Sequence, residues 1–291
     1  MAVGSPSNSR YYVPERSGWP ILGAIALFLL TGGAAMWLND SPLGPWVFAA
    51  GVATLAVMFI GWFSTVVHES QAQVYNDRVD RSFRGGMIAF IVSEIHFFAV
   101  FFGALFYVRQ LVLPWLGGQG VKFTTNELLW EDFEFTWPTN GPGAVGGEFE
   151  IIPAFGIPAL NTAILLTSSV TLTIAHHALK SGNRVVLNSL LGATIALGVT
   201  FIGLQATEYV HGIRDLNLTF NTGVYGSLFY MLTGFHGMHV TVGAIMLLVV
   251  WLRSLRGHFT PTQHFAFEAS AWYWHFVDVV WLGLFVFLYW L

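Results

Sequence analysis

Long apolar runs alternate with short polar segments along almost the whole chain. A helix rises about 1.5 Å per residue, so roughly 20 apolar residues span the ~30 Å hydrocarbon core of a membrane. Seven runs reach this length, and each predicts a membrane-spanning helix. The runs cover approximately residues 18–38, 44–67, 84–112, 156–179, 186–210, 224–252 and 267–291. Turn-forming residues such as Pro42 and Gly182 lie between them.

The pattern leaves one sizeable segment outside the membrane, residues 113–155. This outer loop contains Gly, Pro and Trp but no periodic apolar pattern that would build a core, which favours a lid or a partner contact over a domain. The predicted organisation is therefore a tail at residues 1–17, two helices at 18–67 and five helices at 84–291. The fold class is an all-α integral membrane protein with seven transmembrane helices.

Composition supports a membrane protein. Apolar residues make up 55% of the 291 residues and charged residues only 10%, whereas soluble domains carry about 25% charged residues. The mean hydropathy is +0.62. The absence of cysteine excludes disulfides, thiolate metal sites and a cysteine nucleophile. The net charge of −4 is small and does not bear on nucleic-acid binding, and we expect no nucleic-acid partner.

The basic residues predict the orientation of the helices. Under the seven-span prediction, three of the twelve basic residues, Arg109, Lys122 and Arg214, fall on one side of the membrane. The other nine fall on the opposite side, which the positive-inside rule assigns to the cytoplasm. The N-terminus is therefore expected to be cytoplasmic and Leu291 to lie on the outer side. The same topology places six acidic residues in the outer loop: Glu127, Glu131, Asp132, Glu134, Glu148 and Glu150.

Ionisable residues inside the spans are the first candidates for function, because each destabilises insertion by roughly 2.5–3.5 kcal/mol. Glu94 lies about nine residues into the third run, about 13 Å deep. It could accept protons or bind a partner, or be a buried acid held neutral by hydrogen bonds. Asp278 lies at a similar depth in the last run, with His275 three residues earlier on the same face. A structural Asp–His pair is favoured there over a proton relay.

Histidines suggest a second kind of site. His236 and His239 share one helix face and could contribute two metal ligands, but Gly237 between them equally indicates close helix packing. His176 and the adjacent His177 point about 100° apart, which is poor geometry for a common ion. We therefore expect no metal site, and we assign His236, His239 and Glu208 to helix packing and hydrogen bonding.

Six segments together carry a family resemblance. The longest is FAFEASAWYWHFVDVVW at residues 265–281. The others are SEIHFF at 93–98, PALNT at 158–162, AHHAL at 175–179, GLQATEY at 203–209 and FHGMHV at 235–240. Found in this order on the predicted spans, they resemble subunit III of the cytochrome c oxidase family of haem–copper oxidases. The resemblance covers the chain except the tail and residues 113–155.

The resemblance implies a specific architecture and a supporting role. It implies a two-helix group and a five-helix group around a V-shaped cleft that holds phospholipids. It implies no haem or copper in this chain, since both belong to partner subunits, and direct packing against subunit I beside subunit II. Small accessory subunits and a supercomplex are further partners that it allows. The resemblance implies that Glu94 matches the carbodiimide-reactive carboxylate of the family. It also implies that the chain helps to sustain proton uptake.

The resemblance also implies lipid contacts. The cleft positions are Glu69, Arg253, His68 and Trp62. The chain departs from the family pattern on the second span, where His68 replaces a more usual arginine and Asn76 a frequent histidine.

The preferred function is thus a non-catalytic subunit of a proton-pumping cytochrome c oxidase in a bacterial inner membrane, with the C-terminus in the periplasm. One alternative is a subunit of a quinol oxidase or a nitric oxide reductase. These relatives often lack the first two spans, which are present here. An independent transporter is another alternative, although the chain shows no inverted repeat or paired broken helices.

Overall fold

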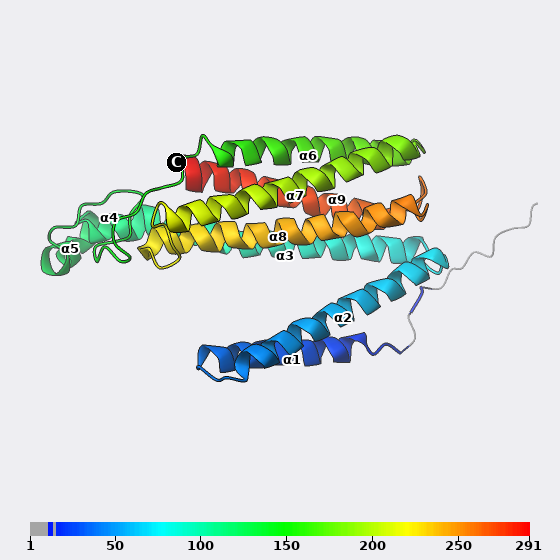
Figure 1. Ribbon diagram of the computed structural model, residues 1–291, viewed down its shortest axis with the longest axis horizontal. Helices are drawn as coiled ribbons and strands as arrows, with labels where there is room; N and C mark the ends of the chain where they lie inside the picture. The colour runs from blue at the N-terminus through cyan, green and yellow to red at the C-terminus, as the bar shows by residue number, and fades with distance from the viewer. Residues whose placement is uncertain (1–10, 14–15) are drawn as a thin grey trace, which may run out of the picture. The chain divides into compact units, whose positions relative to one another are not determined.

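The computed structural model describes residues 11–13 and 16–291, and every regular element in this part of the chain is a helix. Seven of these helical segments are long and apolar enough to cross a membrane (Figure 1), which confirms the predicted all-α membrane fold. Their helices are α1 (Trp19–Leu38), α2 (Gly44–Gln71), α3 (Asp77–Tyr107), α6 (Ile157–Lys180), α7 (Arg184–Arg214), α8 (Gly223–Leu255) and α9 (Phe265–Leu284). Residues 1–10 and 14–15 of the predicted tail, Arg10 included, lie outside the described residues.

Several helices extend beyond the apolar runs that predict them. α3 begins at Asp77, seven residues before the predicted span, because the side-chain oxygen of Asn76 accepts hydrogen bonds from the backbone N–H groups of Arg78 and Val79. This arrangement satisfies backbone donors that the first turn of a helix leaves without partners. At its other end α3 continues through the π-helical turn η1 (Val108–Val112) into α4 (Leu113–Leu116).

The outer loop contains two further short helices that its sequence pattern does not predict. These are η2 (Gly120–Lys122) and α5 (Phe123–Leu129). The rest of the loop is anchored to the connection between α7 and α8. Asn217 donates hydrogen bonds to the carbonyl oxygens of Gly146 and Glu148 at 3.0 and 2.7 Å. The six acidic side chains of the loop are all exposed.

The chain divides into two compact units, Met1–Gly85 and Gly86–Leu291, and the boundary falls inside α3. In the first unit, α1 packs closely on α2 through glycines. A Cβ atom added at Gly33 would lie 2.3 Å from the backbone nitrogen of Phe48, and one at Gly51 would lie 2.6 Å from that of Leu30. Small residues of this kind allow the backbones of membrane helices to approach closely.

In the second unit, α6 packs against α7 and α9, and α8 packs against both α7 and α9. Figure 1 shows these helices running beside one another. α3 reaches α8 and α9 through aromatic side chains. The rings of Phe97 and Phe235 lie 5.0 Å apart, and those of Phe90 and Tyr273 lie 6.1 Å apart.

Trp274 of α9 joins the three other helices of this group. Its side chain is fully buried, and its indole N–H donates a 2.9 Å hydrogen bond to the hydroxyl of Ser168 on α6. Its ring occupies the space that side chains at Gly198 of α7 and Gly243 of α8 would fill. A Cβ atom there would lie 2.5 and 2.9 Å from the indole ring.

The α1–α2 contact predicts that Gly33→Ala destabilises the protein. The added methyl group would meet backbone atoms, so the helices must separate, and overpacking of this kind destabilises by about 1–3 kcal/mol. Gly32→Ala is the matched control, because no atom lies within 4 Å of its added Cβ. Unfolding in SDS measures the difference in free energy. Equal stability of the two variants would contradict the proposed contact.

The packing of Trp274 predicts that alanine substitutions at two glycines of α7 have different effects on stability. Gly198→Ala pushes a methyl group into the indole ring and should lower the thermal unfolding temperature of the detergent-solubilised protein. Gly203→Ala, on the same helix, adds a methyl group with no atom within 4 Å and should leave that temperature unchanged. If both variants lower the unfolding temperature equally, the effect comes from replacing glycine in a helix and not from contact with the indole ring.

Candidate functional site

Glu94 of α3 is hydrogen-bonded to His239 of α8. The carboxylate oxygen Oε2 lies 2.9 Å from the ring nitrogen Nε2. The other ring nitrogen, Nδ1, lies 2.6 Å from the backbone carbonyl oxygen of Phe235 on the same helix. Both side chains are largely buried, with 20% of Glu94 and 8% of His239 exposed.

These hydrogen bonds determine where the protons of the pair lie. A carbonyl oxygen can only accept, so Nδ1 of His239 carries a hydrogen. The 2.9 Å contact at Nε2 then requires one more proton between the imidazole and the carboxyl group. The pair is therefore either neutral acid with neutral imidazole or carboxylate with imidazolium. In both states its net charge is zero, which reduces the free-energy penalty of placing it within the membrane.

Aromatic rings enclose this pair. The imidazole ring of His239 lies 4.9 Å from the ring of Phe98, 5.8 Å from that of Phe97 and 6.3 Å from that of Tyr273. These rings come from α3 and α9, so the pair lies where three helices meet. Apolar surroundings strengthen a satisfied hydrogen bond because the local dielectric constant is low.

Asp278 belongs to a separate polar cluster. Ser169 of α6 donates a short hydrogen bond to Oδ2 of Asp278, and its hydroxyl oxygen lies 2.8 Å from Nδ1 of His275. The direct distance between His275 Nδ1 and Asp278 Oδ2 is 3.9 Å, too long for a hydrogen bond. Ser169 therefore links the two residues, and the cluster joins α6 to α9.

Glu208 and His236 of the second unit also bind local partners. Glu208 accepts a hydrogen bond from the hydroxyl of Tyr289, which belongs to η3 (Phe285–Trp290). His236 is fully buried, and its Nε2 donates to the carbonyl oxygen of Val277 at 3.2 Å. Although His236 and His239 share one helix face, they bind different partners.

The expected lipid positions of the first unit lie on α2. Glu69 accepts hydrogen bonds from the phenols of Tyr12 and Tyr75 at 2.9 and 2.6 Å. Burial, together with the bond to Glu69, raises the pKa of the Tyr75 phenol, so this group remains a donor at neutral pH. His68 and Trp62 are exposed.

Arg253 is the expected lipid position of the second unit. Its guanidinium group lies 4.7 Å from the ring centroid of Phe259, and its Nε has no hydrogen-bond partner among the described residues. Burial, followed by the nearby charges of Arg253 and Arg256, lowers the pKa of His258. This end of α8 is therefore locally electropositive.

Sequence reasoning selected Glu94 and His239 separately and missed that they meet. They are 145 positions apart, and single-sequence patterns do not pair residues across that distance. It also missed Ser169, because membrane helices contain many serines that bond only to their own backbone. The i,i+4 spacing of His264 and Glu268 was a usable signal that was not followed.

The fold and these clusters define a class: a polytopic helical membrane protein whose buried ionisable groups are held in pairs by neighbouring helices. The family model described as Cytochrome c oxidase subunit III matches residues 9–121 and 132–291. The chain belongs to this family.

Individual relatives agree with the family match. A cytochrome c oxidase subunit 3 of Felis catus is 41% identical over 283 residues, and the alignment covers 96% of each chain. Proteins of the same name from Halichoerus grypus and Equus caballus are each 40% identical, again over 96% of both chains.

The comparisons confirm the predicted family and the predicted function, that of a non-catalytic subunit of the oxidase, a component of a respiratory complex. They do not favour the alternatives of a quinol oxidase subunit, a nitric oxide reductase subunit or an independent transporter. Subunit III of such an oxidase does not itself carry redox cofactors.

The Glu94–His239 pair predicts a measurable coupling between the two side chains. In a double-mutant cycle of Glu94→Ala and His239→Ala, the coupling free energy should be about 0.6–1.7 kcal/mol, the range of hydrogen bonds between membrane helices. Unfolding in SDS provides the four stabilities.

His96, an exposed residue on the same helix, supplies the control cycle. Glu94→Ala and His96→Ala should be additive, because His96 bonds to its own helix at the carbonyl oxygen of Val92. A Glu94–His239 coupling no larger than this control would contradict the pair.

Proposed function

We propose that this chain supports the catalytic subunit I of the oxidase by packing against it beside subunit II, holding structural phospholipids and sustaining proton uptake. In this proposal Glu94 and His239 form a fixed, net-neutral polar element and not a link in a proton-conducting chain. The observation that carries the proposal is the hydrogen bond from Nδ1 of His239 to the carbonyl oxygen of Phe235.

That hydrogen bond limits what the imidazole can do. A histidine that relays protons must receive a proton at one nitrogen and release one at the other, so both nitrogens need exchangeable partners. In His239 the Nδ1 hydrogen points at a carbonyl of its own helix, which cannot take up the proton. The pair therefore suits a structural and electrostatic role. This geometry also speaks against a transport relay through Glu94 and Asp278, which bind different partners.

Lipid binding is a second part of the proposal. The guanidinium group of Arg253, with its Nε not hydrogen-bonded to any residue from 11–13 or 16–291, offers donors to an anionic headgroup. Glu69 of α2 forms a hydrogen-bonded polar group with Tyr12 and Tyr75, and the exposed Trp62 lies about two turns earlier on the same helix. Each position is proposed to contact phospholipid from its own unit.

The membrane is proposed to be a bacterial inner membrane, with the N-terminus in the cytoplasm and the C-terminus in the periplasm. Support comes from the nine-to-three distribution of basic residues between the two sides of the predicted topology. In that orientation the exposed acidic side chains of the outer loop face the periplasm, where small accessory subunits or supercomplex partners could contact them.

The supporting role predicts that Glu94→Gln leaves the oxidase assembled and only modestly slower. The amide can still donate to Nε2 of His239, so the contact is retained without a titratable acid. Steady-state oxygen consumption per haem should fall by less than about tenfold, whereas loss of an essential acid or base commonly lowers rates by 10²–10⁴-fold.

Glu127→Gln in the exposed outer loop is the matched control and should behave like the unmodified complex. The haem spectrum and the subunit composition establish that each variant is assembled. Loss of oxygen reduction in a fully assembled Glu94→Gln complex would overturn the supporting role.

A further inference from the structure

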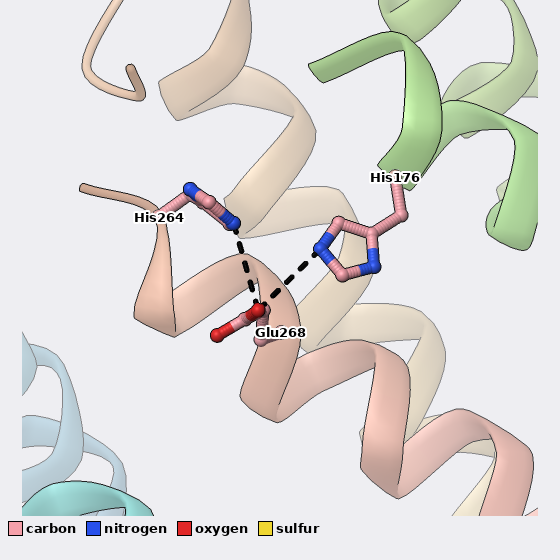
Figure 2. A group of neighbouring side chains, drawn as sticks. All are labelled: His176, His264 and Glu268. Carbon is pink, nitrogen blue, oxygen red and sulfur yellow. Dashed lines mark ion pairs between the residues drawn. The ribbon is translucent and has the colours of Figure 1, made fainter. Parts of the chain in front are cut away.

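Three potential metal ligands converge at the end of the second unit where α6 ends and α9 begins. His176 lies in the last turns of α6, His264 precedes the first residue of α9, and Glu268 lies in the first turn of α9. Figure 2 shows the two imidazole rings directed toward the carboxylate of Glu268. The function described above uses none of these three side chains.

The distances suit a common ion. Oε1 of Glu268 lies 3.6 Å from Nε2 of His176 and 3.5 Å from Nε2 of His264. The three ligand atoms all lie within 4.8 Å of one another. Ligands bound tetrahedrally at about 2.0–2.1 Å from zinc are separated by about 3.3–3.4 Å. Both His–Glu separations are close to that value and are too long for ordinary hydrogen bonds.

The tautomer of His264 is compatible with cation binding. Its Nδ1 lies 3.1 Å from the carbonyl oxygen of Thr260, so Nδ1 carries a hydrogen, and in the neutral form of the ring the Nε2 lone pair faces Glu268. A backbone carbonyl bound to the far nitrogen is also the usual support of a metal-bound histidine. Only 8% of the His264 side chain is exposed.

The nitrogens that face Glu268 also lack other partners. Among the described residues, neither Nε2 of His176 nor Nε2 of His264 has a hydrogen-bond partner. When both nitrogens carry lone pairs, a cation placed between them and the carboxylate would be bound by all three groups. The His239–Glu94 pair is the internal comparison. There the Nε2–Oε2 distance is 2.9 Å, and a single proton accounts for the contact.

We propose that His176, His264 and Glu268 form a binding site for a divalent transition-metal ion of the zinc class. Two imidazoles and one carboxylate match the ligand preference of zinc, and three protein ligands leave a fourth position for water. The bound ion ties the end of α6 to the start of α9. A site made of carboxylate and imidazole ligands does not favour soft metal ions, which prefer thiolate ligands.

This assignment departs from the sequence expectation of no metal site. That expectation was based on His176 and His177, whose side chains point in different directions. The structure confirms the divergence, because His177 is exposed whereas His176 is partly buried beside the ring of His264. The partners of His176 come instead from a segment about ninety positions further along the chain.

Zinc binding to the assembled oxidase tests the proposal. The complex and its variants His264→Gln, Glu268→Gln and His177→Gln are dialysed against Zn²⁺, and zinc is measured per haem. His177→Gln is the matched control, since it removes a neighbouring imidazole that is not part of the site. X-ray absorption at the zinc edge, which is separate from the iron and copper edges, reports the ligands.

We expect the unmodified complex and His177→Gln to bind one more zinc ion per complex than His264→Gln and Glu268→Gln. The X-ray absorption spectrum of the extra zinc ion should show scattering from imidazole ligands. The affinity of the site for zinc should fall at least about tenfold in the two site variants. If His264→Gln fails to assemble, His176→Gln replaces it. Equal zinc content and identical zinc absorption edges in all complexes would overturn the proposed site. A loss of bound zinc in His177→Gln as large as in the two site variants would also overturn it.

Discussion

The indole of Trp274 is the contact on which the second unit depends most directly. Lipid provides no hydrophobic driving force between helices, so shape complementarity and hydrogen bonding must hold them together. Trp274 supplies both, because its ring fills the space over Gly198 and Gly243 while its N–H bonds to Ser168. One side chain of α9 thereby sets the spacing of α6, α7 and α8. The contact of Asp278, one turn further along α9, with Ser169, the residue after Ser168 on α6, follows from that spacing.

Within this framework, ionisable groups are distributed as separate local clusters. Glu94 meets His239, Asp278 meets Ser169 and Glu208 meets Tyr289, each across a helix–helix contact. A polar pair inside a membrane joins helices most strongly when every donor finds an acceptor. In the proposed supporting role, these clusters hold neighbouring helices together and do not relay protons.

Two of the carboxylate–histidine groups in the second unit, Glu94 with His239 and Glu268 with His264, differ in the distance from the ring nitrogen to the carboxylate oxygen. In both, the imidazole Nδ1 bonds to a backbone carbonyl, so Nε2 faces the carboxylate. At 2.9 Å, His239 and Glu94 share a proton. At 3.5 Å, with a second imidazole nitrogen at 3.6 Å, His264 and Glu268 have the separation of ligands around an ion. The same chemical groups therefore support two different functions according to their spacing.

Apolar run lengths and motif order in the sequence are enough to predict the seven helices, the all-α class and the family. These properties are local or cumulative, since the length of an apolar run decides whether it spans the membrane, and several short motifs in order identify relatives. It also identified Glu94, Asp278 and the histidines as unusual at membrane depth. The helix ends were less predictable, because the capping of α3 by Asn76 depends on one side-chain hydrogen bond rather than on hydropathy.

Only the tertiary structure decided which of these residues act together. Glu94 and His239 are 145 positions apart, and Ser169 is 109 positions from Asp278, so helix packing alone brings them into contact. The structure likewise gives His236 and His239 different partners, although they share one helix face. In His239 the bond from Nδ1 to a carbonyl of its own helix leaves Nε2 free to face another helix. The carboxylate at Nε2 comes from α3, so this contact exists only once the helices have packed.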